Sequence, residues 1–334
     1  MKAFQFDPAT YSKKDIFIGG ISTYLYNTEA LIPYVEKFNE SVKHHDNNVS
    51  RNQFNELPVN VVYLLHQRCG DYKFTESIAY TILKQYYEKK EQKVPLICVT
   101  FDNRNHGARK VDDSKNSSWK SGNDTHALDM ISMIDGIIDD TKLIMTYLPS
   151  YLNLEYHLCD HAKVHHNTTI KFSNILSGYS LGGHTVIRFA NKYPDLVDII
   201  NPVVGCNDLS SLLINRLFNS ELDSPNFDKR WFYFDYNELM LTDDQKKYIY
   251  PEAFHNYICQ EDSEIFDNFP FSKIKMFASF GEKDTLVPPR LSKVWVDFYN
   301  NTNSTTGVFI QEDVGHDVTP EMVDKFTSWL VEHT

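Results

Sequence analysis

Hydrophobic and polar positions along this chain follow two periods. Short runs of apolar and β-branched residues predict strands buried on both faces, and apolar residues three or four positions apart predict amphipathic helices. Residues 14–27 alternate around a pair of glycines, which predicts an antiparallel hairpin at a sheet edge. Later strands are predicted at 59–65, 94–101, 169–177, 197–206, 274–280 and 306–311. Helices are predicted at 29–42, at 75–90 with Thr75 as the N-cap, at about 125–148, at 181–192, from near Pro288, and from near Pro320.

The order of these elements predicts the fold class. Strands that alternate with helices form a mostly parallel sheet flanked by helices, which is the α/β class. Single α/β domains with insertions reach 334 residues, and we expect one domain over residues 1–334. Residues 43–57 are polar and predict a surface loop.

One segment, residues 207–271, interrupts the alternation. It is rich in aromatic residues, including the run Trp231–Tyr236, and we expect it to form a cap or lid. Ordinary core packing is the alternative, and for the aromatic run itself core packing is the favoured interpretation.

Composition narrows the class of protein. Apolar residues make up 42% and aromatic residues 14%, which favours a folded globular chain. The formal net charge is -12 and no run of Lys or Arg occurs, so a nucleic-acid surface is not expected. The five cysteines include no C-x-x-C pair, which favours a reducing compartment. The first residues lack a secretory signal, and no segment approaches the ~20 apolar residues of a membrane span, so we expect a soluble, cytoplasmic protein.

The candidate chemistry begins at Gly178-Tyr-Ser180-Leu-Gly182, between a predicted strand and a predicted helix. A G-x-S-x-G pattern in this context is typical of a serine on a sharp strand-to-helix turn, where the flanking glycines let the strand and the helix approach each other. A serine hydroxyl needs a base to take its proton and a carboxylate to orient that base. Asp284 and His316 each follow a later predicted strand, and the C-terminal ends of parallel strands share one sheet edge. We therefore expect Ser180, Asp284 and His316 to meet.

With these residues the chain resembles the α/β-hydrolase fold superfamily, whose members share the serine turn and the order serine, acid, histidine. The resemblance runs from about residue 15 to the end, excluding the insertions. It implies Ser180 as nucleophile, Asp284 as acid, within a Gly-x-x-Asp-x-x-Val-Pro stretch typical of that turn, and His316 as base. It also implies acyl transfer without a metal or organic cofactor.

Two loops are further matched by this resemblance. Asp102-Asn-Arg-Asn-His106-Gly resembles an Asp-x-Arg-x-His-Gly loop that usually organises hydrogen bonds beside the site. The oxyanion hole is expected from the backbone N–H of Leu181 and from Gln67 or Arg68, in the loop after the strand ending at Leu65. Here the chain departs from the family, because His66-Gln67-Arg68 stands where His-Gly-x is usual. The residues expected to line the site are His66, Tyr179 and His106.

Other assignments are less favoured. His184 is the alternative base, but it lies on the predicted helix that follows Ser180, where packing should fix its side chain. Asp208, which follows another predicted strand, is the alternative acid. The histidine-rich tract 157–166 resembles a metal site, but no completing ligand is evident and a solvated connection is favoured.

Together these features predict a serine hydrolase acting on the ester or thioester of a small or medium acyl group. A peptidase or an acyltransferase on the same three residues remains open, because the fold hosts many reactions. So does a non-catalytic binding protein of this fold, which the substitution at Gln67 would favour.

Overall fold

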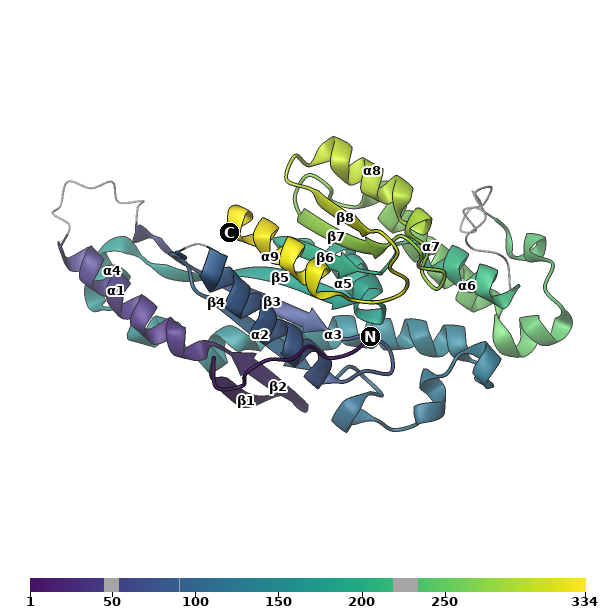
Figure 1. Ribbon diagram of the computed structural model, residues 1–334, viewed down its shortest axis with the longest axis horizontal. Coiled ribbons are helices and arrows are strands. Elements are labelled where there is room, and N and C mark those ends of the chain that lie inside the picture. Colours follow the sequence, from purple (N-terminus) through teal and green to yellow (C-terminus); the bar gives the residue numbers. More distant parts are fainter. Residues whose placement is uncertain (45–53, 90, 219–233) are drawn as a thin grey trace.

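The computed structural model describes residues 1–44, 54–89, 91–218 and 234–334. These residues form one sheet of eight strands with helices on both faces (Figure 1). The strands are β1 Lys13–Ile18, β2 Ile21–Tyr26, β3 Glu56–Leu65, β4 Leu96–Phe101, β5 Thr169–Tyr179, β6 Ile199–Val203, β7 Lys275–Gly281 and β8 Gly307–Gln311. The helices are α1 Leu31–His44, α2 Tyr72–Lys89, α3 His126–Leu152, α4 Asp160–His166, α5 Leu181–Lys192, α6 Leu209–Leu217, α7 Glu252–Asn268, α8 Lys293–Thr302 and α9 Pro320–His333.

The sheet has the order β1-β2-β4-β3-β5-β6-β7-β8. The β1–β2 and β2–β4 pairs are antiparallel and every later pair is parallel, as expected for an α/β sheet with a hairpin at one edge. In the β3–β5 register Leu65 lies opposite Gly178, so the loop after β3 begins beside the turn that carries Ser180. This register decides which loops border the candidate site.

Two hydrophobic cores cover the two faces of the sheet. On β3, Val61, Tyr63 and Leu65 point into the core shared with α1, α3 and α5, while the alternate residues Val62 and Leu64 point toward α2 and α9. Figure 1 shows α2 and α9 side by side over that second face. Burial on both faces explains why the central strands read as continuous apolar runs.

Several element boundaries differ from the sequence prediction. Thr75 is not an N-cap, because α2 begins at Tyr72. Two carboxylates accept hydrogen bonds from the first backbone amides of α2. Asp102 accepts from the Tyr72 N–H at 2.8 Å, and Asp71 accepts from the Lys73 N–H at 3.0 Å. β6 is shorter than predicted. Residues 160–166 form a short helix, α4, where the sequence predicts a solvated connection.

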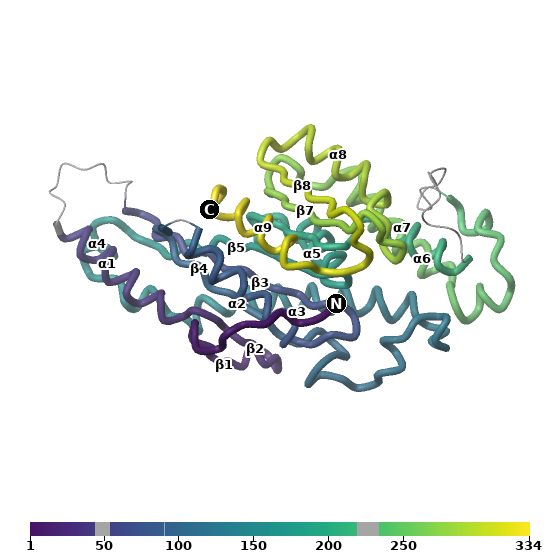
Figure 2. The backbone as a smooth tube through the Cα atoms, in the orientation of Figure 1, coloured from purple at the N-terminus to yellow at the C-terminus, as the bar shows by residue number. Residues whose placement is uncertain are grey.

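The segment 207–271 lies between β6 and β7 and carries α6 and α7. Figure 2 shows α6 toward one end of an elongated molecule, with α1 and α4 at the other. Of the aromatic run, residues 231–233 lie outside the described residues, and Tyr236 is buried. Likewise, most of the expected loop 43–57 lies outside the described residues, at 45–53. No helix in the described part of the chain is long and apolar enough to cross a membrane.

Candidate active site

Ser180 occupies a strained turn between β5 and α5. Its φ of 54° is a left-handed value that non-glycine residues rarely adopt, and such a conformation costs on the order of 1–3 kcal/mol. The flanking glycines make the turn possible. A Cβ on Gly178 would lie 2.0 Å from the Gly182 carbonyl oxygen, and one on Gly182 would lie 2.1 Å from the Leu65 carbonyl oxygen. The close approach of β5, α5 and the end of β3 therefore requires glycine at both positions.

Three side chains from distant parts of the chain meet at this turn. The Ser180 Oγ lies 2.8 Å from the His316 Nε2, and the His316 Nδ1 lies 2.7 Å from the Asp284 Oδ2. A carboxylate only accepts hydrogen bonds, so Nδ1 carries a proton and Nε2 of the neutral ring accepts from the serine hydroxyl. The structure thus brings together the three residues that the sequence analysis singled out, in the order serine, imidazole, carboxylate.

The carboxylate end of this line is fixed and the imidazole end is accessible. The side chain of Asp284 is 1% exposed, and its Oδ1 accepts from the backbone N–H groups of Leu286 and Val287, both at 2.9 Å. The side chain of His316 is 17% exposed. The turn after β7 therefore holds the carboxylate in place while the ring remains open to a small molecule.

In the loop after β3, two backbone amides have no hydrogen-bond acceptor within the described part of the chain. Its Gln67 carbonyl accepts from the Gly70 N–H at 3.2 Å, and the Cys69 N–H donates to the His106 Nε2 at 3.0 Å. Among the described residues no acceptor occurs for the N–H groups of Gln67 and Arg68. Leu181 is the first residue of α5, so its N–H has no carbonyl acceptor within the helix. These three amides are the ones expected for an oxyanion hole.

Two buried histidines hold that loop against the loop after β4. His66 donates from Nδ1 to the Gln67 carbonyl at 2.7 Å and accepts at Nε2 from the Asn103 N–H at 2.9 Å. His106 donates from Nδ1 to the Arg104 carbonyl at 2.8 Å. Burial lowers the pKa of His66 to about 3 and also lowers that of His106, so both rings are neutral and can accept from backbone N–H groups. Both side chains organise hydrogen bonds here.

Three other residues that the sequence analysis considered lie apart from this line. Tyr179 is in the core and does not line the site, because its ring packs edge-on against Phe74 and its hydroxyl accepts from Ser177. His184 is buried and accepts from the Cys206 N–H at 2.9 Å. Asp208 is the N-cap of α6, where it accepts from the Ser211 N–H at 2.9 Å. His316 pairs with Asp284 and not with Asp208.

The histidine-rich tract forms no metal cluster among the described residues. His157 and His161 have the spacing of two ligands on one helix, but His157 ends a 3₁₀ turn and His161 lies on α4, so they do not share a helix. Asn153 and Asn167, at positive φ, bracket these two elements. The tract is a short helical connection to β5.

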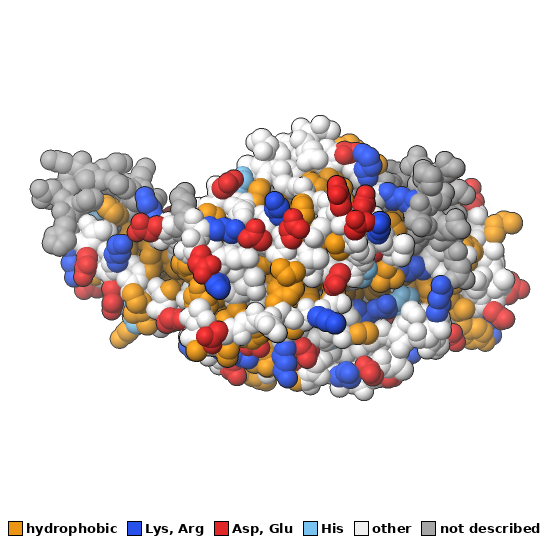
Figure 3. All heavy atoms as spheres, viewed as in Figure 1, with side chains coloured by type: hydrophobic (Ala, Val, Ile, Leu, Met, Phe, Trp, Pro, Cys, Tyr) orange, Lys and Arg blue, Asp and Glu red, His pale blue; other side chains and the backbone are white. Residues whose placement is uncertain are grey.

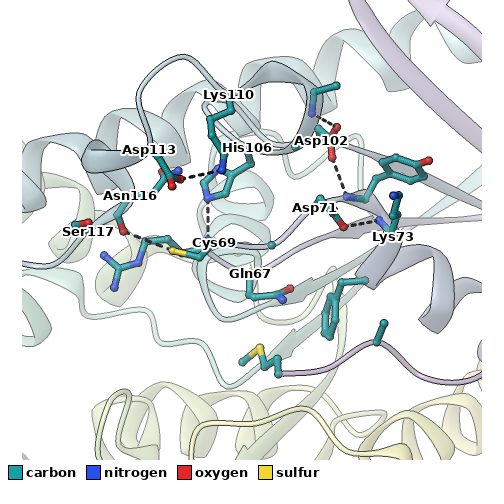
Figure 4. Close-up of a pocket in the computed structure, with 18 of the residues that line it drawn as sticks. Gln67, Cys69, Asp71, Lys73, Asp102, His106, Lys110, Asp113, Asn116 and Ser117 are labelled. Carbon is teal, nitrogen blue, oxygen red and sulfur yellow. Dashed lines mark hydrogen bonds and ion pairs between the residues drawn. The ribbon is translucent and has the colours of Figure 1, made fainter. Parts of the chain in front are cut away.

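A cavity of about 1190 Å³ adjoins the loop after β3. Figure 4 shows Gln67, Cys69, His106 and Asn116 around it, with Asp102 and Asp71 toward α2. Arg68 also lines it, whereas Ser180, Asp284 and His316 are not among the described residues that do. The cavity therefore lies next to the candidate site and borders it through Gln67 and Arg68.

The sequence reading missed one side chain near the site. Arg216, on α6, donates from Nη2 to the Leu286 carbonyl at 2.8 Å, two residues after Asp284. Arg216 has an ordinary helical context, and only the fold brings α6 against the turn after β7. No spacing in the sequence could have indicated this contact.

Several solved structures have a fold similar to that of this chain over nearly its whole length. The crystal structure of TT1662 from Thermus thermophilus is similar over 97% of both chains, with a TM-score of 0.51 and 12% identity. Est1E from Butyrivibrio proteoclasticus, with ferulic acid bound, is 14% identical over 96% of this chain and 98% of that chain, with a TM-score of 0.48. The esterase Pf2001 from Pyrococcus furiosus is 12% identical over 99% and 96%, with a TM-score of 0.48. No family model and no curated protein sequence matches the chain.

Proposed function

We propose, because the chain has the α/β-hydrolase fold, that it is a serine hydrolase which cleaves an ester or thioester through Ser180, His316 and Asp284. The observation that supports this most is the unbroken line of contacts, 2.8 Å from Ser180 to His316 and 2.7 Å from His316 to Asp284, at a serine with positive φ. A strained backbone conformation costs free energy that a serine in ordinary core packing does not require, and such conformations are common at functional sites.

In the proposed first step, His316 Nε2 takes the hydroxyl proton as Ser180 Oγ attacks the carbonyl carbon of the substrate. The C–O bond to Ser180 forms and the carbonyl π electrons move to oxygen. Asp284 keeps Nδ1 protonated and stabilises the imidazolium that results. The imidazolium then donates its proton to the departing alcohol or thiol, which leaves an acyl group on Ser180.

In the second step, water attacks this acyl group while His316 takes one of its protons, and Ser180 leaves with that proton. Both steps place negative charge on the carbonyl oxygen. We propose that the amides of Leu181 and of Gln67 or Arg68 stabilise this charge, aided by the positive N-terminal end of α5. Losing one such donor typically slows turnover by about 10²–10³-fold.

The remaining parts of the proposal concern the substrate and the segment over the site. We propose that the substrate is a small acyl compound and that the reaction needs no cofactor. The cysteine pattern supports a cytoplasmic location. We further propose that residues 207–271 form a cap on a single domain. Arg216 on α6 supports this, since it contacts the turn that holds Asp284.

A fluorophosphonate probe tests the proposal, because it phosphonylates only an activated serine. We expect wild-type protein to be labelled and Ser180→Ala to be unlabelled, with circular dichroism showing that both are folded. Ser132→Ala is the matched control, since Ser132 is exposed on α3, and it should be labelled at the wild-type rate.

Absence of labelling in folded wild-type protein would contradict the proposal and favour a non-catalytic binding protein of this fold. Labelling that persists in Ser180→Ala would contradict the assignment of the nucleophile. Hydrolysis of p-nitrophenyl esters, acyl-CoA thioesters and peptide p-nitroanilides would then separate the esterase, thioesterase and peptidase alternatives.

A further inference from the structure

Two arginines beside the candidate site have no carboxylate partner among the residues that the structure describes. Among the described residues Arg104 and Arg109 pair with Asp140, and Arg188 pairs with Asp262 and Glu261. Arg68 and Arg216 have no carboxylate oxygen within 4.0 Å anywhere in the described part of the chain. This contrast is notable in a protein with a net charge of -12, in which acidic groups are abundant.

Arg216 reaches the site from α6. Its Nη2 donates to the Leu286 carbonyl, while its Nε is shielded from solvent and has no hydrogen-bond partner in the described residues. Asp284 is near enough to raise the pKa of Arg216, but His316 and two backbone amides already occupy the oxygens of that carboxylate. Burial and the charge of Arg68 nevertheless lower the pKa of Arg216 to about 10, so it is still a cation at neutral pH.

Arg68 reaches the same region from the loop after β3. Its Nη1 lies 2.9 Å from the Nδ1 of His126, the first residue of α3, and the same ring nitrogen lies 3.0 Å from the Ser117 carbonyl oxygen. Burial, followed by the charges of Arg68 and Arg216, lowers the pKa of His126 to about 3. The ring is therefore neutral and supplies no balancing charge.

Arg68, Arg216 and His126 form a cluster in which the charge of each arginine acts on the pKa of His126. Lys, Arg, Asp and Glu side chains are interspersed over the face seen in Figure 3. Two cations drawn together and partly removed from water repel each other and lose hydration, and a ligand anion offsets both costs. Guanidinium groups bind carboxylate and phosphate oxygens in a planar, two-pronged geometry, which suits them to this role.

We propose that Arg68 and Arg216 bind an anionic group, a carboxylate or a phosphate, of the molecule whose acyl bond is cleaved at Ser180. This inference rests on the proposed hydrolase function and adds the class of substrate. The anion lies on the side of the site between the loop after β3 and α6, so the preferred substrate is a negatively charged ester or thioester.

Selectivity between matched esters tests the inference. Values of kcat/KM are measured for p-nitrophenyl butyrate, which is neutral, and for mono-p-nitrophenyl glutarate, which ends in a carboxylate. We expect the charged-to-neutral ratio to fall at least about tenfold in Arg216→Gln, and to recover in part in Arg216→Lys, which restores the charge. Arg104→Gln is the control and should keep the wild-type ratio, since Arg109 still pairs with Asp140.

A binding measurement keeps the inference testable apart from catalysis. Isothermal titration calorimetry with glutarate and with inorganic phosphate uses Ser180→Ala, with and without Arg68→Gln or Arg216→Gln. Binding of either anion that weakens at least about tenfold in these variants supports the inference and tells carboxylate from phosphate. An unchanged ester ratio together with no arginine-dependent binding of either anion overturns it. If the wild-type protein shows no Ser180-dependent hydrolysis but still binds an anion through these arginines, the hydrolase proposal alone is refuted.

Discussion

The glycines around Ser180 show that the geometry of the site depends on the absence of single Cβ atoms. Gly182 has no Cβ to meet the Leu65 carbonyl oxygen, and this absence allows α5 to start against the end of β3. We expect Gly182→Ala to lower the free energy of unfolding by about 1–3 kcal/mol, because backbone atoms on both sides must shift. The same shift would move the Leu181 amide and slow fluorophosphonate labelling.

Gly20→Ala is the matched control for Gly182→Ala. Gly20 lies in the β1–β2 turn with φ of 88° and has open space around its missing Cβ. Its substitution should cost about 1 kcal/mol through backbone strain alone and leave labelling at the wild-type rate. Urea denaturation measures both stabilities. A Gly182→Ala protein that is labelled as fast as wild type would contradict a role for this close approach in the site.

The buried histidines predict how stability depends on pH. Burial lowers the pKa of His184 from 6.5 to about 3, so in this range the unfolded chain binds a proton that the folded chain does not. The stability it contributes is present above pH 6.5 and is lost as the pH falls toward 3, by up to about 1.4 kcal/mol per pH unit.

We expect His184→Gln to have a shallower loss of stability between pH 6.5 and 5 than wild type. The glutamine oxygen retains an acceptor for the Cys206 N–H without adding a titrating group. Urea denaturation at several pH values measures the two slopes. Equal slopes would show that His184 is not the source of this dependence.

At the scale of elements, the loop after β3 depends on the loop after β4. The Cys69 N–H donates to His106, and this bond holds the turn that carries the Gln67 and Arg68 amides. We expect His106→Ala to lower kcat about tenfold with a smaller change in KM, since misplaced amides weaken binding of the transition state more than of the substrate.

His106→Gln tests whether His106 acts through this positioning. Its side-chain oxygen can still accept from the Cys69 N–H, so it should recover part of the lost kcat. Equal loss in His106→Ala and His106→Gln, or a change confined to KM, would indicate a different role for this side chain.

The elements that the sequence predicted best are those with strong periodicity. α5 matches its predicted bounds, since it begins directly after the Ser180 turn, ends before Pro194 and has a clear apolar face. Boundaries set by tertiary contacts were missed: α2 starts before Thr75 because Asp102, thirty residues away, accepts from the Tyr72 amide. The placement of Ser180, Asp284 and His316 at one sheet edge was predictable because each follows a predicted strand, and parallel strands end at the same edge.

What the sequence could not supply is contact between insertions and the site. Arg216 is one polar residue on an amphipathic helix, and its approach to the turn after β7 depends on how α6 packs. Tyr179 illustrates the opposite case. Its neighbour Ser180 lies at the site, but the strand places its own side chain in the core.

For the whole molecule, the question is whether residues 207–271 unfold with the sheet. One hydrophobic core includes residues of the hairpin, the central strands, α6, α7 and α8. A buried ionic contact adds to it: Arg188 on α5 contacts Asp262 on α7, and Asp262 also accepts from the Ser210 N–H of α6 at 2.6 Å. The proposed cap is thus fastened to the helix that follows Ser180.

We therefore expect one cooperative unfolding transition in urea, with tryptophan fluorescence and far-ultraviolet circular dichroism giving the same midpoint. Arg188→Met leaves Asp262 buried without its cation and should lower the free energy of unfolding by about 3–5 kcal/mol. Because α6 and α7 share the core of the sheet, the weakened protein should still unfold in one step, at lower urea. An additional early transition in Arg188→Met would show that the segment folds as a separate unit and would contradict a single domain over residues 1–334.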